Sequence, residues 1–104
     1  MNVSFSTRGW QQIPWEQIYY FESRGKRIYA RLRGEEIGFT GTLESLAETL
    51  PENYRRCHRS FIVNVEKIDR VRFAENLILL WDGLAVPLSR SYKRSMKERE
   101  SGQL

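Results

Sequence analysis

Short runs of alternating hydrophobic and polar residues recur along most of the chain and predict strands. The clearest run is residues 28–33, in which Ile28, Ala30 and Leu32 alternate with tyrosine and arginine, as is typical of a half-buried strand. Further short runs rich in β-branched and aromatic residues, which favour strands, cover residues 18–22, 37–40, 61–63, 68–73, 77–81 and 84–88. Asp82-Gly83 predicts a tight hairpin, because both residues tolerate a positive φ angle.

One segment has a helical period instead. Leucine or alanine stands at positions 43, 46, 47 and 50, and the spacing i, i+3, i+4, i+7 predicts one apolar helix face over residues 42–50. Thr42 is the expected N-cap, because its hydroxyl can accept from a free first-turn N–H. Pro51 should end the helix, since it disfavours helical backbone in the residue before it. The tail from Ser91 predicts either a short C-terminal helix or a frayed end, so the fold class is mainly β.

Length and composition describe one soluble domain. The chain has 104 residues, of which 29% are charged and 40% hydrophobic, as in ordinary folded proteins. No stretch approaches the roughly 18 apolar residues of a membrane span, and the N-terminus lacks the layout of a secretory signal. Cys57 is the single cysteine, which excludes an internal disulfide and fits a reducing compartment. We therefore expect a cytoplasmic domain without cofactor or membrane contact.

The positive charge is concentrated in three segments. The net charge is +4, from 17 lysines and arginines against 13 acids. Residues 24–33, 55–59 and 90–99 hold five, three and five of the basic residues and a single acid, Glu98. If the segments converge on one face, they form the footprint of a site for a polyanion. If they point in different directions, they are ordinary solvated surface, and charge alone does not decide between the two.

The most informative stretch is Arg56–Asn64, with the sequence Arg-Cys-His-Arg-Ser-Phe-Ile-Val-Asn. It resembles the signature of LytTR domains, the C-terminal DNA-binding modules of bacterial response regulators of the LytR and AgrA type. The segments 18–22, 42–51 and 86–92 resemble the same family in the same order. The resemblance implies small stacked antiparallel β-sheets with one short helix near residues 42–50. It places a domain over residues 10–98, between a linker or N-terminal edge segment (1–9) and a flexible tail (99–104).

LytTR domains insert loops, rather than a recognition helix, into successive major grooves of DNA with repeated half-sites. The resemblance implies one base-contacting position in each basic segment: Lys26 or Arg27, then Arg59, then Arg90. An arginine fork can bond O6 and N7 of guanine together, which is worth about 1–3 kcal/mol of discrimination. Phosphate contacts, which position a protein without reading sequence, are expected from Ser23, Arg24, Ser60, Ser91, Lys93 and Arg94.

The resemblance also implies a function and partners. The function is sequence-specific duplex DNA binding for transcription regulation in a two-component system. The partners are double-stranded DNA with repeated half-sites, a second copy on an adjacent site and, in the full-length protein, an upstream receiver domain.

Cys57 and His58 suggest a nucleophile and its base, but adjacent residues on a strand point to opposite faces. The chain has no other histidine or cysteine for a metal site, and no paired carboxylates indicate acid–base catalysis, so we expect no enzyme. One hypothesis is that the neighbouring arginines acidify the Cys57 thiol and make it redox-active. The other is that Cys57 is a small buried hydrophobe and that His58 is hydrogen-bonded near the base of the recognition loop.

Two other function classes remain open. A single-stranded nucleic-acid or RNA-binding β module would need exposed aromatic residues among the basic ones. We expect the aromatic residues to pack in the core instead, namely Trp10, Trp15, Tyr19, Tyr20, Phe21 and Trp81. A protein-interaction domain would use the basic loops to meet an acidic partner. Whether aromatic or basic side chains line the face that the basic segments share separates these classes.

Overall fold

The structure is a computed structural model, which describes the backbone of residues 2–6 and 10–101 and the side chains of residues 13–97. The strands and helices are β1 (Asn2–Ser6), β2 (Trp10–Pro14), β3 (Tyr20–Arg24), β4 (Arg27–Leu32), β5 (Glu35–Thr40), α1 (Leu43–Ala47), β6 (Tyr54–His58), β7 (Phe61–Asn64), β8 (Ile68–Arg72), β9 (Leu77–Leu80), β10 (Ala85–Pro87) and α2 (Arg90–Ser101). Single 3₁₀ turns cover Trp15–Gln17, Val65–Lys67, Phe73–Glu75 and Trp81–Gly83.

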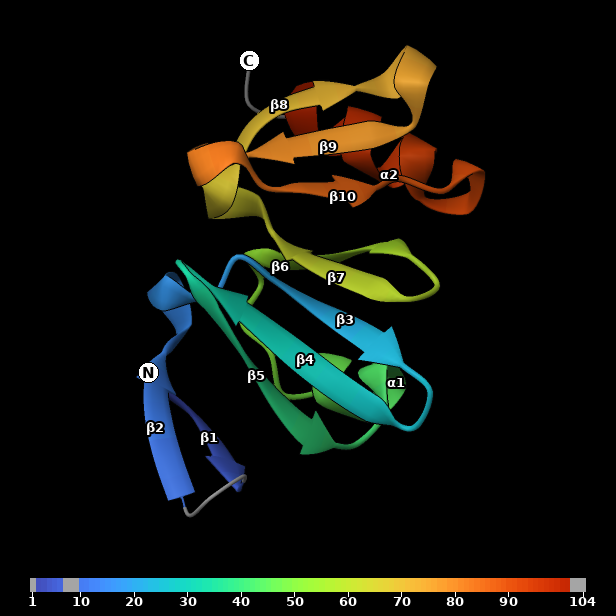
Figure 1. The fold of residues 1–104 in the computed structure, drawn as a ribbon. Coiled ribbons are helices and arrows are strands. Elements are labelled where there is room, and N and C mark those ends of the chain that lie inside the picture. The colour runs from blue at the N-terminus through green and yellow to red at the C-terminus, as the bar shows by residue number, and fades with distance from the viewer. Residues whose placement is uncertain (1, 7–9, 102–104) are drawn as a thin grey trace.

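The strands form three antiparallel sheets. The central sheet has the order β5-β4-β3-β7-β6, a second sheet has the order β10-β9-β8, and β1 pairs with β2 in a hairpin. The second sheet lies beside the β7–β6 end of the central sheet, with α2 behind it (Figure 1). This arrangement confirms the expected mainly β fold of small stacked antiparallel sheets.

The central sheet lies between two hydrophobic clusters, because its residues alternate between two faces. Ile62 belongs to one cluster and its neighbour Val63 to the other. The first cluster includes Phe21, Ile28, Ala30 and Tyr54, with the α1 residue Leu43 packed among them. The second includes Cys57 together with residues of the second sheet, the β10–α2 connection and α2, namely Ile78, Leu80, Val86, Leu88 and Met96. Both faces of the central sheet are therefore anchored.

Helix α1 is shorter than predicted. Its N-cap is confirmed, because Thr42 Oγ1 accepts a hydrogen bond from the Ser45 amide at 3.2 Å. The helix ends at Ala47, before Pro51 is reached. Both the amide and the hydroxyl of Thr49 donate to the Leu46 carbonyl, at 3.0 and 2.9 Å. This i→i+3 bonding replaces the α-helical pattern and ends the helix one turn early.

The C-terminal end differs from the sequence prediction, whereas β1 fits the predicted N-terminal edge segment rather than a linker. Helix α2 has 12 residues and extends to Ser101, so the predicted boundary between domain and tail at residue 98 falls inside a helix. Within residues 1–9, β1 is a strand paired with β2; the remaining residues of that segment, and 102–104 of the tail, lie outside the described residues.

The Asp82-Gly83 turn is confirmed, with φ angles of 63° and 78°. No helix among the described residues is long and apolar enough to cross a membrane.

Candidate nucleic-acid interface

Three basic connections lie along one edge of the molecule, on the right in Figure 1: the β3–β4 turn, the β6–β7 turn and the β10–α2 junction. Two backbone hydrogen bonds hold them together. The Ser23 amide at the end of β3 donates to the Ser60 carbonyl at 2.9 Å. The Ser89 amide, just before α2, donates to the Cys57 carbonyl at 2.9 Å. The three basic segments therefore converge at these connections, which charge patterning alone did not establish.

The first connection is a two-residue turn with Lys26 at its tip. Gly25 has a φ angle of 61°, which suits the first central position of a type II′ turn. Lys26 is exposed and lies beside the same hollow as Arg59. The guanidinium of Arg27, by contrast, lies over the Tyr29 ring, 6.0 Å from its centroid. Of the two candidate readers, only Lys26 thus faces the second connection.

Arg24 was predicted to contact phosphate, and its surroundings argue against that role. Its guanidinium donates to both carboxylate oxygens of Glu36, at 2.8 and 2.7 Å, and to Glu22 at 3.0 Å. The hydrogen bonds from Arg24 lower the pKa of Glu36. The same guanidinium lies 4.3 Å from the Tyr29 ring centroid. Two carboxylates already occupy donors of the Arg24 guanidinium, which leaves Arg24 poorly placed to contact phosphate.

The second connection, the β6–β7 turn, presents Arg59 at an exposed position. His58 lies at its base, where Nδ1 accepts a hydrogen bond from the Ser60 amide at 3.1 Å. The His58 ring also packs edge-on against Phe61, with centroids 5.6 Å apart. This confirms the structural role expected for His58.

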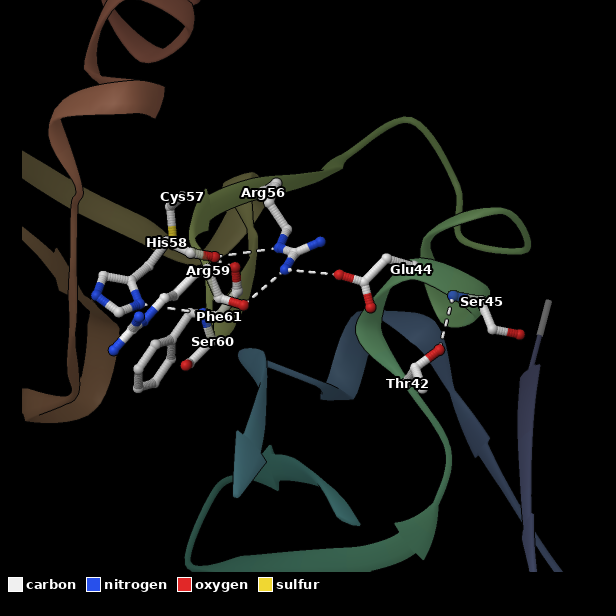
Figure 2. Close-up of polar contacts among 9 residues, drawn as sticks. All are labelled: Thr42, Glu44, Ser45, Arg56, Cys57, His58, Arg59, Ser60 and Phe61. Carbon is white, nitrogen blue, oxygen red and sulfur yellow. Dashed lines mark hydrogen bonds and ion pairs between the residues drawn. The ribbon is translucent and has the colours of Figure 1, made fainter. Parts of the chain in front are cut away.

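Arg56 is a residue whose role the sequence reasoning missed. Figure 2 shows its guanidinium between the turn on one side and Glu44 of α1 on the other. Nε donates to the His58 carbonyl at 3.1 Å, and Nη2 donates to the Arg59 carbonyl at 2.6 Å. Nη2 also lies 3.4 Å from Glu44 Oε2. Its place at the start of the Arg-Cys-His-Arg-Ser motif is a sequence signal for a specific role, whereas charge patterning treats Arg56 only as one of the basic residues of the segment 55–59.

The third connection differs from the predicted loop, because Arg90 is the first residue of α2. Arg90, Lys93 and Arg94 follow the spacing i, i+3, i+4 and therefore share one face of the helix. Tyr92 and Met96 pack on the second hydrophobic cluster, which directs that face away from the core. Ser91 lies beside Arg90 in the first turn and is exposed.

A hollow of about 460 Å³ separates the first and second connections. Most of its lining is basic or carries a hydroxyl group, and Glu44 is its one acidic residue. The lining residues are Ser23, Gly25, Lys26, Thr40, Gly41, Thr42, Leu43, Glu44, Arg56 and Arg59. The basic and hydroxyl groups of this lining can hold an anionic group.

Cys57 lies behind this edge and is fully buried. Burial raises the pKa of its thiol to about 12, and Arg56 offsets this only in part. The thiol is 3.8 Å from the Phe61 carbonyl, to which it donates. The hypothesis of an acidified, redox-active thiol is therefore wrong in its premise, because loss of solvation outweighs the nearby arginines. The alternative, a small buried hydrophobe, is confirmed.

Not every basic residue joins the edge. Arg33 lies beside Lys67 and Glu35 at a separate hollow, and Arg55 lies beside Glu52 and Glu66 at another. The three connections therefore meet along one edge, whereas some residues of the basic segments lie elsewhere on the surface.

The exposed aromatic platform that single-stranded binding requires is absent from residues 13–97 near these connections. Trp81 is the large hydrophobic residue that is exposed, at 53%, which corrects its expected core position. It lies at the β9–β10 turn, on the left edge in Figure 1, opposite the basic connections. Tyr19 and Phe21 are buried as expected, and the side chain of Trp10 lies outside the described residues.

A small β domain whose basic connections converge along one edge has the features of a nucleic-acid-binding module. The family described as the LytTr DNA-binding domain matches residues 8–100. The chain belongs to this family, and it is a DNA-binding domain.

Individual relatives agree with this assignment. The chain is 34% identical over 90 residues to the transcriptional regulatory protein BtsR of Salmonella typhi, covering 83% of this chain and 37% of that protein. It is 34% identical over 88 residues to the sensory transduction protein LytT of Enterococcus faecalis, covering 81% and 36%. It is 34% identical over 73 residues to the accessory gene regulator protein A of Staphylococcus epidermidis, covering 68% and 30%. The chain thus spans about a third of the length of these curated relatives.

A solved structure shares the fold. A chain described as a LytTr DNA-binding domain from Bacillus cereus superimposes with a TM-score of 0.83 at 29% sequence identity. The match covers 93% of this chain and 94% of that one. The architecture of nearly the whole domain is therefore that of the family.

Proposed function

We propose that this domain binds duplex DNA sequence-specifically to regulate transcription, with its three basic connections entering successive major grooves of repeated half-sites. The observation that carries the proposal is the pair of backbone hydrogen bonds, Ser23 to Ser60 and Ser89 to Cys57, which join these connections along one edge. The domain extends 41 Å along its longest axis. This length is comparable to one helical turn of B-DNA, which is about 34 Å.

Lys26, Arg59 and Arg90 are the proposed base readers. Each is exposed, and each belongs to a different connection. Lys26 is preferred to Arg27 because Arg27 lies against Tyr29. A lysine or an arginine can donate to the acceptor pair on the major-groove edge of guanine.

The proposed phosphate contacts flank these readers. They are Ser23, Ser60, Ser91, Lys93 and Arg94. Contacts of this kind fix the register of a protein on DNA and make its affinity salt-dependent, without adding sequence preference.

The larger assembly is also a proposal. The relatives named as regulatory and sensory transduction proteins are about three times as long as the matched segment. Kinship with these regulators supports our proposal of an upstream receiver domain in the full-length protein, a cytoplasmic location and two copies on adjacent half-sites. Half-sites on one side of the duplex would lie near whole helical turns apart.

The test begins with selection of preferred sites from random duplexes. Affinity is then measured for the selected duplex, a scrambled duplex and the single strand of the selected sequence, each over a range of salt. The proposal predicts tighter binding to the selected duplex by an order of magnitude or more, and a loss of affinity to every DNA as salt rises. Equal, weak binding to both duplexes would overturn it in favour of a general charged surface for an acidic partner. Tighter binding to the single strand would overturn it in favour of the single-stranded class.

A further inference from the structure

The β6–β7 turn contains an irregularity that affects how Arg59 is presented. In the ladder, Arg56 pairs with Ile62 and His58 pairs with Phe61, so Cys57 is an extra residue at a register shift. A bulge of this kind bends its strand and re-aims the side chains beside it. The direction of Arg59 is therefore set by local contacts rather than by a regular hairpin.

Arg56 supplies two of those contacts. Its planar guanidinium donates to consecutive carbonyls, those of His58 and Arg59, at 3.1 and 2.6 Å. Its side chain is 21% exposed, whereas that of its ion-pair partner Glu44 is 76% exposed. An exposed ion pair contributes little energy, so the carbonyl bonds are the main interactions of Arg56. A guanidinium engaged in this way is poorly placed to read a base as well.

The other peptide groups of the turn are also fixed. The Ser60 amide donates to His58 Nδ1 at 3.1 Å, and the Ser60 carbonyl accepts from the Ser23 amide at 2.9 Å. The backbone on both sides of Arg59 is thus held, and its side chain alone remains to be ordered on binding. A reading group held in advance in its productive geometry loses less entropy on binding and discriminates better.

We propose that Arg56 is a positioning residue, which sets the base preference of the second connection by holding the backbone of Arg59. It does so without contacting a base itself. This inference rests on the proposed function and deepens it, because Arg56 would control sequence specificity although it is not one of the proposed base readers.

The first test compares Arg56→Lys with a matched control, Arg55→Lys. Lysine keeps the charge but lacks the planar fork that reaches two carbonyls. Arg55 is the exposed neighbour on β6 and lies beside Glu52 and Glu66 instead. Arg56→Lys should reduce the ratio of selected-site to scrambled affinity by about tenfold, with unchanged scrambled-duplex affinity and salt dependence. Arg55→Lys should leave all three quantities unchanged.

The second test is a double-mutant cycle with Arg59→Ala. If Arg56 acts through Arg59, adding Arg56→Lys to Arg59→Ala should change the ratio no further. Single-base variants of the selected site should show relaxed preference for Arg56→Lys only at the position that Arg59→Ala also relaxes. Thermal unfolding, followed in parallel, measures any general loss of structure, which would reduce binding to all DNAs alike.

Four results would overturn the inference. Additive losses in the cycle, or a smaller salt dependence for Arg56→Lys, would mean that Arg56 contacts DNA directly. If Arg56→Lys has the same ratio of selected-site to scrambled affinity as the wild type, the hydrogen bonds from Arg56 to the turn do not affect base preference. If the wild type itself prefers no sequence, the proposed function fails first and the inference fails with it, so the two failures are distinguishable.

Discussion

At the residue scale, the same side-chain chemistry serves different purposes over a few positions of β6 and its turn. The donors of Arg56 are used on backbone carbonyls, while Arg59 is exposed at the tip. Cys57, between them, is fully buried although three arginines lie nearby in sequence. Burial and hydrogen bonding, rather than residue type, therefore decide which of these residues can meet a ligand.

The buried Cys57 thiol should be unreactive in the folded domain. Its pKa is raised from 9.0 to about 12 by burial, and the thiolate is the reactive form. Iodoacetamide at pH 8 should therefore modify the native protein far more slowly than the urea-unfolded protein. DNA affinity should be the same under reducing and mildly oxidising conditions.

The same shift gives a pH dependence of stability. Because the pKa of the thiol is raised in the folded state, the unfolded chain loses the thiol proton at lower pH than the folded domain does. The free energy of unfolding should therefore be constant in this respect below about pH 9 and should fall between about pH 9 and about pH 12. A Cys57→Ala variant should lack this component in chemical unfolding measured as a function of pH. Native labelling as fast as unfolded labelling would contradict the burial of the thiol.

At the element scale, α1 is too short to be stable by itself and depends on its cap and its packing. It has five residues, far below the length at which isolated helices form in water. Leu43 is buried in the first cluster, and Leu46 and Leu50 pack against it. Glu44 on the outer side reaches Arg56. The helix thus connects the core to the second basic connection.

Loss of the N-cap should therefore be measurable. Thr42→Ala removes the acceptor for the Ser45 amide, and we expect the free energy of unfolding to fall by about 1 kcal/mol. Urea unfolding followed by circular dichroism measures the change.

Ser45→Ala is the matched control for the cap. Ser45 is exposed and uses its backbone amide, not its side chain, in the cap. Since alanine favours helix more than serine, this variant should be neutral or slightly stabilised. Equal destabilisation by both substitutions would contradict the role given to the cap.

Periodicity predicted β4, which buries one face, and a short apolar run predicted β7, which is buried on both faces. Periodicity failed for β6, Tyr54–His58, whose central residues are two arginines and a bulged cysteine, so no alternation appears. The conformational rule for proline also placed the end of α1 at Pro51, whereas the hydrogen bonds of Thr49 end the helix earlier. The basic edge required the family resemblance, because its convergence depends on contacts between distant segments. The motif marks the position of Arg56, but its role depends on hydrogen bonds to backbone carbonyls that appear only in the folded turn.

At the scale of the whole molecule, Asn64 joins several parts of the fold. It is the buried polar residue of the described core, at 0% exposure. Its Nδ2 donates to the Ile18 carbonyl at 2.9 Å, and its Oδ1 accepts from Asn53 Nδ2 and from the Glu66 amide, each at 3.0 Å. These bonds link β7 to the segments before β3, before β6 and before β8.

Asn64→Ala should destabilise the whole domain, because it removes the hydrogen bonds to the Ile18 carbonyl, the Asn53 side chain and the Glu66 amide from a fully buried position. We expect a loss of about 1–3 kcal/mol in the free energy of unfolding, measured by urea titration. Asn53→Ala, which removes one of these bonds, should cost less. The account of Asn64 as a junction would be contradicted if both variants were as stable as the wild type.

The central claim, that three separate connections read DNA along one edge, is tested most directly by site selection with three variants. Lys26→Ala, Arg59→Ala and Arg90→Ala are each selected on random duplexes beside the wild type. Arg33→Ala, on a different hollow, serves as the control. The account predicts that each variant loses about 1–3 kcal/mol of preference at a different position of the site, with Arg59's position between the other two, and that the control matches the wild type. Uniform loss of affinity for all sequences, or relaxation of one shared position, would contradict it.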